Sequence, residues 1–163
     1  MSTEFSWDAP DTAVAVIDST GTSGDAGGVD LKNLATAAYV TAALVTPTDP
    51  RPLYVSYLVK GKLGAGTSTS GTTFLKAWFM DKSDGTNVTS YSGTNIPTHA
   101  PDFVVFWPTI SNAGPFVLVS TPRYIMRPAW PYKILIQQGS GQTTTNVNND
   151  NVLYEISLNE KGT

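Results

Sequence analysis

The hydrophobic pattern divides the chain into short apolar runs that are separated by turn-forming residues. Residues 53–63 read LYVSYLVKGKL and are rich in the β-branched and aromatic residues that favour strands. In such a strand Val55 and Tyr57 share one side, while Tyr54 and Leu58 share the other, so both sides are partly apolar. This pattern suits a sandwich or a subunit interface better than a sheet with one side in water.

Similar runs recur along most of the chain. Further strands are expected at residues 13–18, 73–80, 103–107, 115–121, 123–127, 132–136 and 152–158. Eight or nine strands without a convincing long helix predict an all-β fold, an antiparallel two-sheet sandwich that is jelly-roll-like. The expected core contains Val55, Tyr57, Leu75, Trp78, Val105, Val117, Ile134 and Ile156.

Residues 30–45, DLKNLATAAYVTAALV, carry a mixed signal. Leu31 and Leu34 fit a helical stripe with Asp30 as the N-cap, and the alanines favour a helix. Residues 39–45 instead fit an extended run. We predict a short helical turn around the two leucines, followed by a strand.

Charged residues are few and unevenly distributed. Residues 1–50 hold seven acidic side chains and one basic one, Lys32, whereas residues 51–163 hold six acidic and nine basic side chains. The acidic leader is either simply solvated or lies against a basic surface on the body or on a neighbouring subunit. Because the chain has no dense stripe of lysine and arginine, nucleic-acid binding is not expected.

Residues 1–29 are expected to form an extended N-terminal arm with an edge strand near residues 13–18, and residues 30–163 the sandwich domain. The arm contains the flexible stretch STGTSGDAGG, yet it also carries apolar residues that water disfavours leaving exposed. Our hypothesis is that these residues bind a neighbouring subunit or a shell; the alternative is an arm folded back on its own sandwich. The partner-binding candidates in the arm are Phe5, Trp7, Val14, Val16 and Ile17.

The chain offers little catalytic chemistry. It has no cysteine and one histidine, His99, which lies in a loop near Asp102 without an obvious third group. Asp81, Asp84 and Asn87 of the stretch DKSDGTN could be drawn as calcium ligands, but an Asp-Gly turn explains this stretch better. We therefore expect no enzyme activity, no catalytic residue, no cofactor and no metal ion. No stretch approaches the roughly 20 apolar residues of a membrane span, so no membrane contact is expected.

The C-terminal part reads as a hairpin with an unusual tip. Two apolar runs flank residues 139–150, which are nearly all Gly, Ser, Thr, Asn or Gln. The tip is either a contact loop or a hairpin end without function. As contact residues we single out Thr143, Thr144, Asn146 and Asn148.

Taken together, three motifs resemble a family of small virion structural proteins of tailed bacteriophages, some of which decorate the capsid. The motifs are the opening DLKNLATAAYVTAAL, the turn DGTN and the strand PYKILIQQGSGQ, and the resemblance runs from about residue 30 to residue 158. It implies a β-sandwich that decorates or cements a capsid through protein–protein contacts. The implied partners are the major capsid protein or other virion proteins and further copies of the chain. The implied location is the virion, after synthesis in the bacterial cytoplasm.

Two features depart from the family pattern, namely the long NVNND tip and the acidic leader. They leave open a tail or neck accessory protein. A carbohydrate- or receptor-binding module with the same sandwich is a further alternative, because tryptophans and Asn/Thr loops also suit sugars. A hydrolase is the least supported alternative, since a base and a nucleophile are missing.

Overall fold

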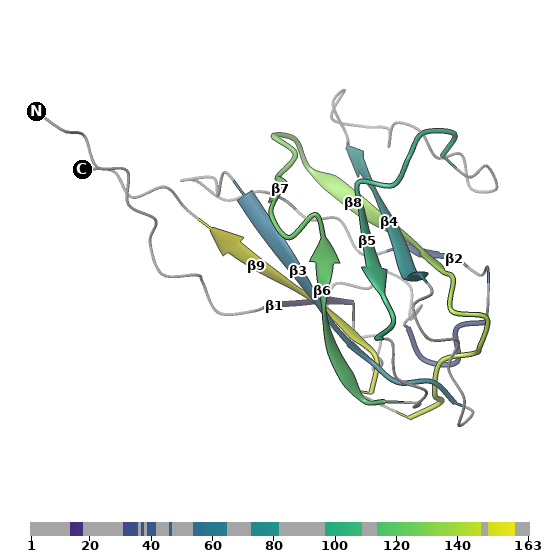
Figure 1. The fold of residues 1–163 in the computed structure, drawn as a ribbon. Coiled ribbons are helices and arrows are strands. Elements are labelled where there is room, and N and C mark those ends of the chain that lie inside the picture. Colours follow the sequence, from purple (N-terminus) through teal and green to yellow (C-terminus); the bar gives the residue numbers. More distant parts are fainter. Residues whose placement is uncertain are drawn as a thin grey trace, which may run out of the picture.

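The computed structural model describes residues 14–17, 31–35, 37, 39–41, 46, 54–64, 73–81, 97–108, 114–147 and 150–158. Within these ranges the chain forms nine strands and no helix (Figure 1). The strands are β1 (Val14–Ile17), β2 (Tyr39–Thr41), β3 (Tyr54–Gly61), β4 (Thr73–Asp81), β5 (Phe103–Phe106), β6 (Phe116–Thr121), β7 (Ile125–Met126), β8 (Tyr132–Gln138) and β9 (Val152–Leu158). All their pairings are antiparallel, which confirms the predicted antiparallel all-β fold.

The strands follow one hydrogen-bonded path in the order β1-β9-β3-β6-β5-β4-β8-β2, with β7 also beside β3. Strand β6 makes the path continuous because it changes partner along its length. Its residues 116–119 pair with β3, whereas Ser120 and Thr121 pair with β5. The structure therefore does not confirm a division into two separate sheets, and the jelly-roll arrangement stays a prediction.

The two halves of this path close over a shared core. On one side lie β1, β9, β3 and β7, and on the other lie β5, β4, β8 and β2 (Figure 1). The Tyr57 ring on β3 stacks on the Phe103 ring on β5 with centroids 4.4 Å apart. Phe79 on β4 meets Tyr132 on β8 edge to face, at 5.2 Å. Aromatic rings from both halves thus fill the centre of the molecule.

Alternation along the strands explains most of the core. Of the residues predicted to be buried, the structure confirms Val55, Tyr57, Leu75, Trp78, Val105 and Ile134. The predicted burial of Val117 is wrong, since this side chain is 71% exposed. Phe116 and Leu118 pack against the core, so the residue between them points outward. Ile156 is only half-buried, because Glu155 takes the inward position beside it on β9.

Two local predictions need correction. Residues 31–35 form a turn without a helix, although the strand expected after them is present as β2. The prediction of a C-terminal hairpin is wrong, because β8 pairs with β4 and β2, whereas β9 pairs with β3 and β1. The polar loop between them therefore crosses from one half of the path to the other.

The predicted edge strand of the arm is found as β1, at one end of the path. Val14 lies opposite Glu155 and Ala15 opposite Tyr154 on β9 of the same chain. For this strand the pairing is the one that the folded-back alternative expects. The side chains of Val14, Val16 and Ile17 are not described, and residues 1–13 lie outside the described part of the chain.

A buried polar cluster, the Glu155 cluster, joins the two halves inside the core. The Glu155 carboxylate on β9 accepts hydrogen bonds from the hydroxyls of Tyr57 on β3, at 2.7 Å, and Tyr132 on β8, at 2.9 Å. Arg127 forms an ion pair with the same carboxylate at 3.1 Å and donates from Nε to the Tyr132 hydroxyl. A buried carboxylate is costly unless it is paired in this way, so the cluster constrains how β8 sits against β9.

Replacing Arg127 with methionine tests the role of this cluster. The variant Arg127→Met leaves the Glu155 carboxylate buried without its cation, and we expect the free energy of unfolding to fall by about 3–5 kcal/mol. The additional change Glu155→Gln removes the unpaired charge and should restore part of the loss. Urea unfolding measures both effects; a loss below about 1 kcal/mol for Arg127→Met would contradict this role.

Candidate functional site

The polar loop between β8 and β9, the tip loop (residues 139–150), is held on one side by the turn at residues 31–35. The Thr144 amide donates to the Leu34 carbonyl at 3.1 Å, and the Asn33 amide donates to the Thr145 carbonyl at 3.0 Å. Asn33 adopts a positive φ of 53°, which asparagine tolerates better than most residues. These bonds join segments that are more than a hundred residues apart in sequence.

The residues that follow β3 hold the tip loop on its other side. The Gly64 amide donates to the Thr143 carbonyl at 2.9 Å, and the Thr145 amide donates to the Lys62 carbonyl at 3.0 Å. Leu63 and Thr144 form an isolated antiparallel bridge between these bonds. The tip loop is thus the middle of three extended segments rather than a hairpin end.

The buried Thr144 side chain binds the loop to the turn at residues 31–35. Its hydroxyl accepts a hydrogen bond from the Leu34 amide at 2.7 Å and donates to the Leu31 carbonyl at 2.5 Å. The residue is 2% exposed, so this hydroxyl serves the loop itself. We therefore assign the predicted partner contact to Thr143 and Asn146, which are exposed, and no longer to Thr144.

Buried amide groups fix both ends of the loop. At its start the fully buried Gln138 accepts from the Ser140 amide at 2.9 Å and donates to the Ser140 hydroxyl at 2.7 Å and to the Gln142 carbonyl. Gly139 is needed there because a Cβ atom would lie 2.9 Å from the Thr73 carbonyl oxygen. At its end, the Asn151 side chain accepts from the backbone amide of the residue that follows β3, at 2.8 Å.

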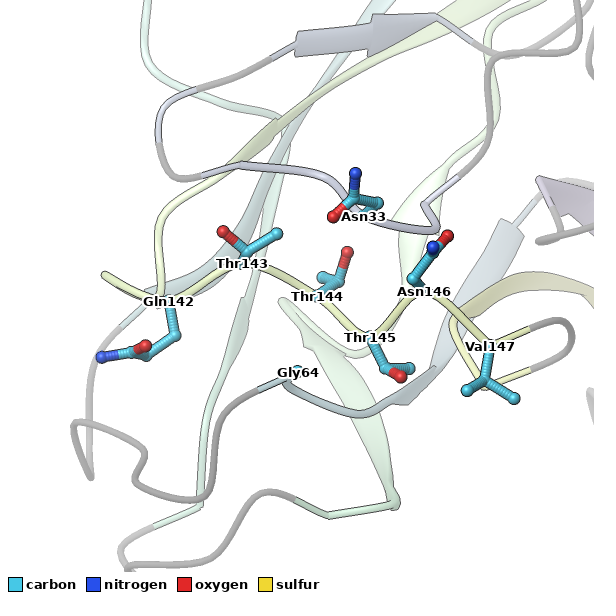
Figure 2. A pocket seen from close by; sticks show the side chains of 8 residues that line it. All are labelled: Asn33, Gly64, Gln142, Thr143, Thr144, Thr145, Asn146 and Val147. Carbon is cyan, nitrogen blue, oxygen red and sulfur yellow. The ribbon is translucent and has the colours of Figure 1, made fainter.

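A pocket of about 380 Å³ opens at the centre of the tip loop (Figure 2). We call it the tip pocket; it is lined by Asn33, Gly64, Gln142, Thr143, Thr144, Thr145, Asn146 and Val147. Figure 2 shows Thr145 on the opposite side of the loop from Thr144 and Asn146. The lining offers hydroxyl and amide groups and no ionisable side chain, so it can form hydrogen bonds but cannot supply a general acid or base.

The structure brings three of the predicted contact residues, Thr143, Thr144 and Asn146, to this pocket. Asn148, Phe5 and Trp7 lie outside the described residues. The sequence interpretation missed the lining residues outside its contact list, which are Asn33, Gly64, Gln142, Thr145 and Val147. No periodic pattern could have joined Asn33 to the tip, because their contact depends on long-range pairing.

His99 and Asp102 do not form a catalytic pair. The exposed His99 ring donates from Nδ1 to the Ala100 carbonyl at 2.8 Å. The Asp102 carboxylate instead accepts the Phe79 amide at 2.7 Å, where it caps the pairing of β4 and β5. Both residues serve local structure.

Metal and membrane sites were sought within the described ranges only. There, no group of three or more His, Asp or Glu residues could hold a metal ion. Of the possible calcium ligands, Asp84 and Asn87 lie outside these ranges, and the side chain of Asp81 is not described. The same ranges contain no helix with the length and apolar character of a membrane span. That the protein needs no metal ion or cofactor stays a prediction.

Among the residues that the structure describes, the groups with shifted pKa values belong to the Glu155 cluster. Burial and the negative charge of Glu155 raise the pKa of Tyr57 well above its ordinary value of 10.0, and the same causes raise the pKa of Tyr132. Burial is the largest single influence on the pKa of Arg127 and lowers it, but the charge of Glu155 and the interactions with Tyr132 and Tyr57 together outweigh burial, so that the pKa is raised. The two tyrosine hydroxyls and the Arg127 guanidinium keep their protons at neutral pH and all contact the Glu155 carboxylate, which indicates a structural role.

Comparison with protein-family models, with curated proteins and with solved structures gives no match to this chain.

The raised tyrosine pKa values predict a loss of stability at alkaline pH. Above pH 10 an unfolded tyrosine releases its proton, whereas Tyr57 and Tyr132 retain theirs in the folded state. The free energy of unfolding should therefore fall by up to about 1.4 kcal/mol per pH unit for each of the two tyrosines. The variant Tyr57→Phe should show a shallower slope above pH 10 and the wild-type slope between pH 6 and 9. Equal slopes above pH 10 would count against the shift at Tyr57.

The contribution of the Thr144 hydroxyl to holding the tip loop can be tested by substitution. The nearly isosteric change Thr144→Val leaves the Leu34 amide and the Leu31 carbonyl without the hydroxyl, and it should lower the free energy of unfolding by about 1–3 kcal/mol. The matched change at the exposed Thr143, Thr143→Val, should alter it by no more than about 0.5 kcal/mol. Equal effects in chemical denaturation would contradict the assigned role of Thr144.

Proposed function

We propose that the chain is a non-enzymatic virion structural protein that decorates or cements the capsid of a tailed bacteriophage. The three sequence motifs support this family, and the all-β scaffold is compatible with it. The proposed partners are the major capsid protein or other virion proteins. A tail or neck position is the nearest alternative within the same class.

One observation carries the proposal: hydrogen bonds hold a long polar loop without catalytic groups in one backbone conformation at the surface. Backbone hydrogen bonds hold it on both sides, while Thr143, Asn146 and Val147 remain exposed. A surface that is ordered before binding loses little conformational entropy when a partner docks. Short polar side chains also cost less to immobilise than long charged ones. These properties suit a protein that makes the same contact many times on one particle.

Further copies of the chain are a second proposed partner. β1 and β2 end the strand path, and each pairs with a single described strand, β9 and β8 respectively. Strands at the end of a sheet are common sites of pairing with another chain.

A mass-spectrometric census of purified empty heads, tails and whole particles tests the proposed location. We expect the chain in heads and whole particles, in a fixed ratio to the major capsid protein. Its presence in tails alone would move the proposal to a tail protein. Its absence from all particles would overturn the virion role.

Two matched variants test whether the tip makes the contact. Thr143→Arg introduces a bulky charge at the tip pocket, and we expect it to reduce incorporation into particles at least tenfold. Thr98→Arg makes the same change at an exposed residue of another loop and should leave incorporation unchanged. Both variants should keep the wild-type melting temperature. Normal incorporation of Thr143→Arg would show that the tip is not the contact surface.

A carbohydrate-binding function is the second candidate, and the tip pocket favours it. Its volume falls in the range of small-molecule sites, and its hydroxyl and amide groups match the hydroxyls of a neutral sugar. It has no aromatic residue in its lining on which a sugar could stack. Binding to a glycan array that Thr143→Arg abolishes would support this candidate. An empty array together with incorporation into heads would exclude it.

A further inference from the structure

The outward side of the half that contains β3 and β9 is unusually apolar for a sheet surface. Three cross-strand pairs share this side: Met126 with Tyr54, Val119 with Leu58, and Val117 with Lys60. Val117 is 71% exposed, Met126 is 68% exposed and Val119 is 39% exposed. On β9 the same side continues with Leu158, Ile156 and Tyr154, which lie opposite β3. We call this surface the outer face.

The opposite side of the same strands already faces the core. Val55, Tyr57 and Val59 alternate with the outer-face residues of β3, and all three are fully buried. An antiparallel sheet that is apolar on both sides normally has a cover on each. The outer face runs along β3 for roughly 20 Å at about 3.4 Å per residue, the length of a short extended segment.

Positive charge accompanies this apolar surface. The exposed Arg123, which lies between β6 and β7, is positioned over the Tyr124 ring at 5.7 Å. Glu155 is the one acidic residue within β3, β6, β7 and β9, and it is directed into the core. An acidic segment with apolar anchors would therefore complement the outer face.

The N-terminal segment has this chemistry and starts from the right place. Val14 begins β1 opposite Glu155, and β1 is antiparallel to β9, so a continuation of the β1 direction toward the N-terminus would lead toward Leu158. Leu158 lies opposite Tyr54, which in turn lies opposite Met126. Crossing from β1 to β7 takes three strand spacings, about 14 Å, whereas twelve extended residues reach roughly 40 Å.

We propose that residues 2–13 cover the outer face of their own chain. Phe5 and Trp7 are two residues apart, so an extended segment directs both to the same side, toward Met126 and its neighbours. Glu4, Asp8 and Asp11 supply the charge that complements Arg123. This inference does not depend on the proposed virion role, because it concerns another surface and the isolated protein.

A spin label on the segment provides the test, and the chain has no cysteine that would interfere. Ser6→Cys places the label between the two anchors, and methionine methyl groups report its proximity by NMR. We expect the Met126 methyl signal to lose most of its intensity. The Met80 methyl, buried in a separate cluster with Trp78 and Leu135, should keep most of its intensity and serves as the control.

A mixture of two differently labelled samples distinguishes a segment of the same chain from a segment of a neighbouring copy as the cover of the outer face. Spin-labelled chains without isotope are combined with isotope-labelled chains without a spin label, and here Met126 should keep its intensity. Broadening in the mixture would show that a neighbouring copy supplies the segment and would overturn the proposal. Unchanged Met126 intensity in both samples would also overturn it, and the cover would then be another partner.

A double-mutant cycle adds a second readout. Trp7→Ala and Met126→Ala should each lower the melting temperature by a few degrees, and the double variant should lower it by less than the sum. Val147→Ala, at an exposed apolar residue of the tip, is the matched control and should add independently to Trp7→Ala. Strict additivity of Trp7→Ala and Met126→Ala would contradict the contact.

Discussion

The carboxylate of Glu155 is the constraint on which the arrangement of the two halves depends. It is 6% exposed and therefore needs partners inside the protein. Those partners come from both halves: Tyr57 on β3, Tyr132 on β8, and Arg127 between β7 and β8. Removing one partner leaves a buried charge or hydroxyl unsatisfied, so this cluster favours one closure of the strand path over alternatives that apolar packing alone would allow.

That closure dictates the course of the tip loop. Because β8 and β9 belong to different halves, the chain between them cannot make a tight hairpin and must cross the end of the molecule. On the way it pairs with the turn at residues 31–35 and with residues 62–64. A connection that could have been a loose polar loop thereby becomes a surface with fixed backbone positions and a pocket. The proposed contact with other virion proteins depends on this conversion.

Strand positions followed from the sequence, whereas strand partners did not. Period-two alternation identifies β3 and its buried side, since Val55 and Tyr57 are apolar at the right spacing. The same rule misplaced Val117, because apolar residues occupy both sides of β6 and alternation alone cannot choose the inner side. It also suggested a hairpin, since two neighbouring runs usually pair. Only part of the pocket lining could be predicted from the sequence. The polar composition indicated Thr143 and Asn146. Asn33 joins them only because the turn at residues 31–35 pairs with a segment more than a hundred residues away.

Hydrogen exchange of the isolated protein tests most directly the central claim, that the tip loop is built before any partner arrives. The amides of Leu34, Gly64, Thr144 and Thr145 all donate hydrogen bonds within this surface. The account predicts that they exchange slowly, with protection approaching that of the β3 and β9 amides. Exchange of these four amides at the rate of an unprotected peptide, while β3 and β9 stay protected, would contradict it.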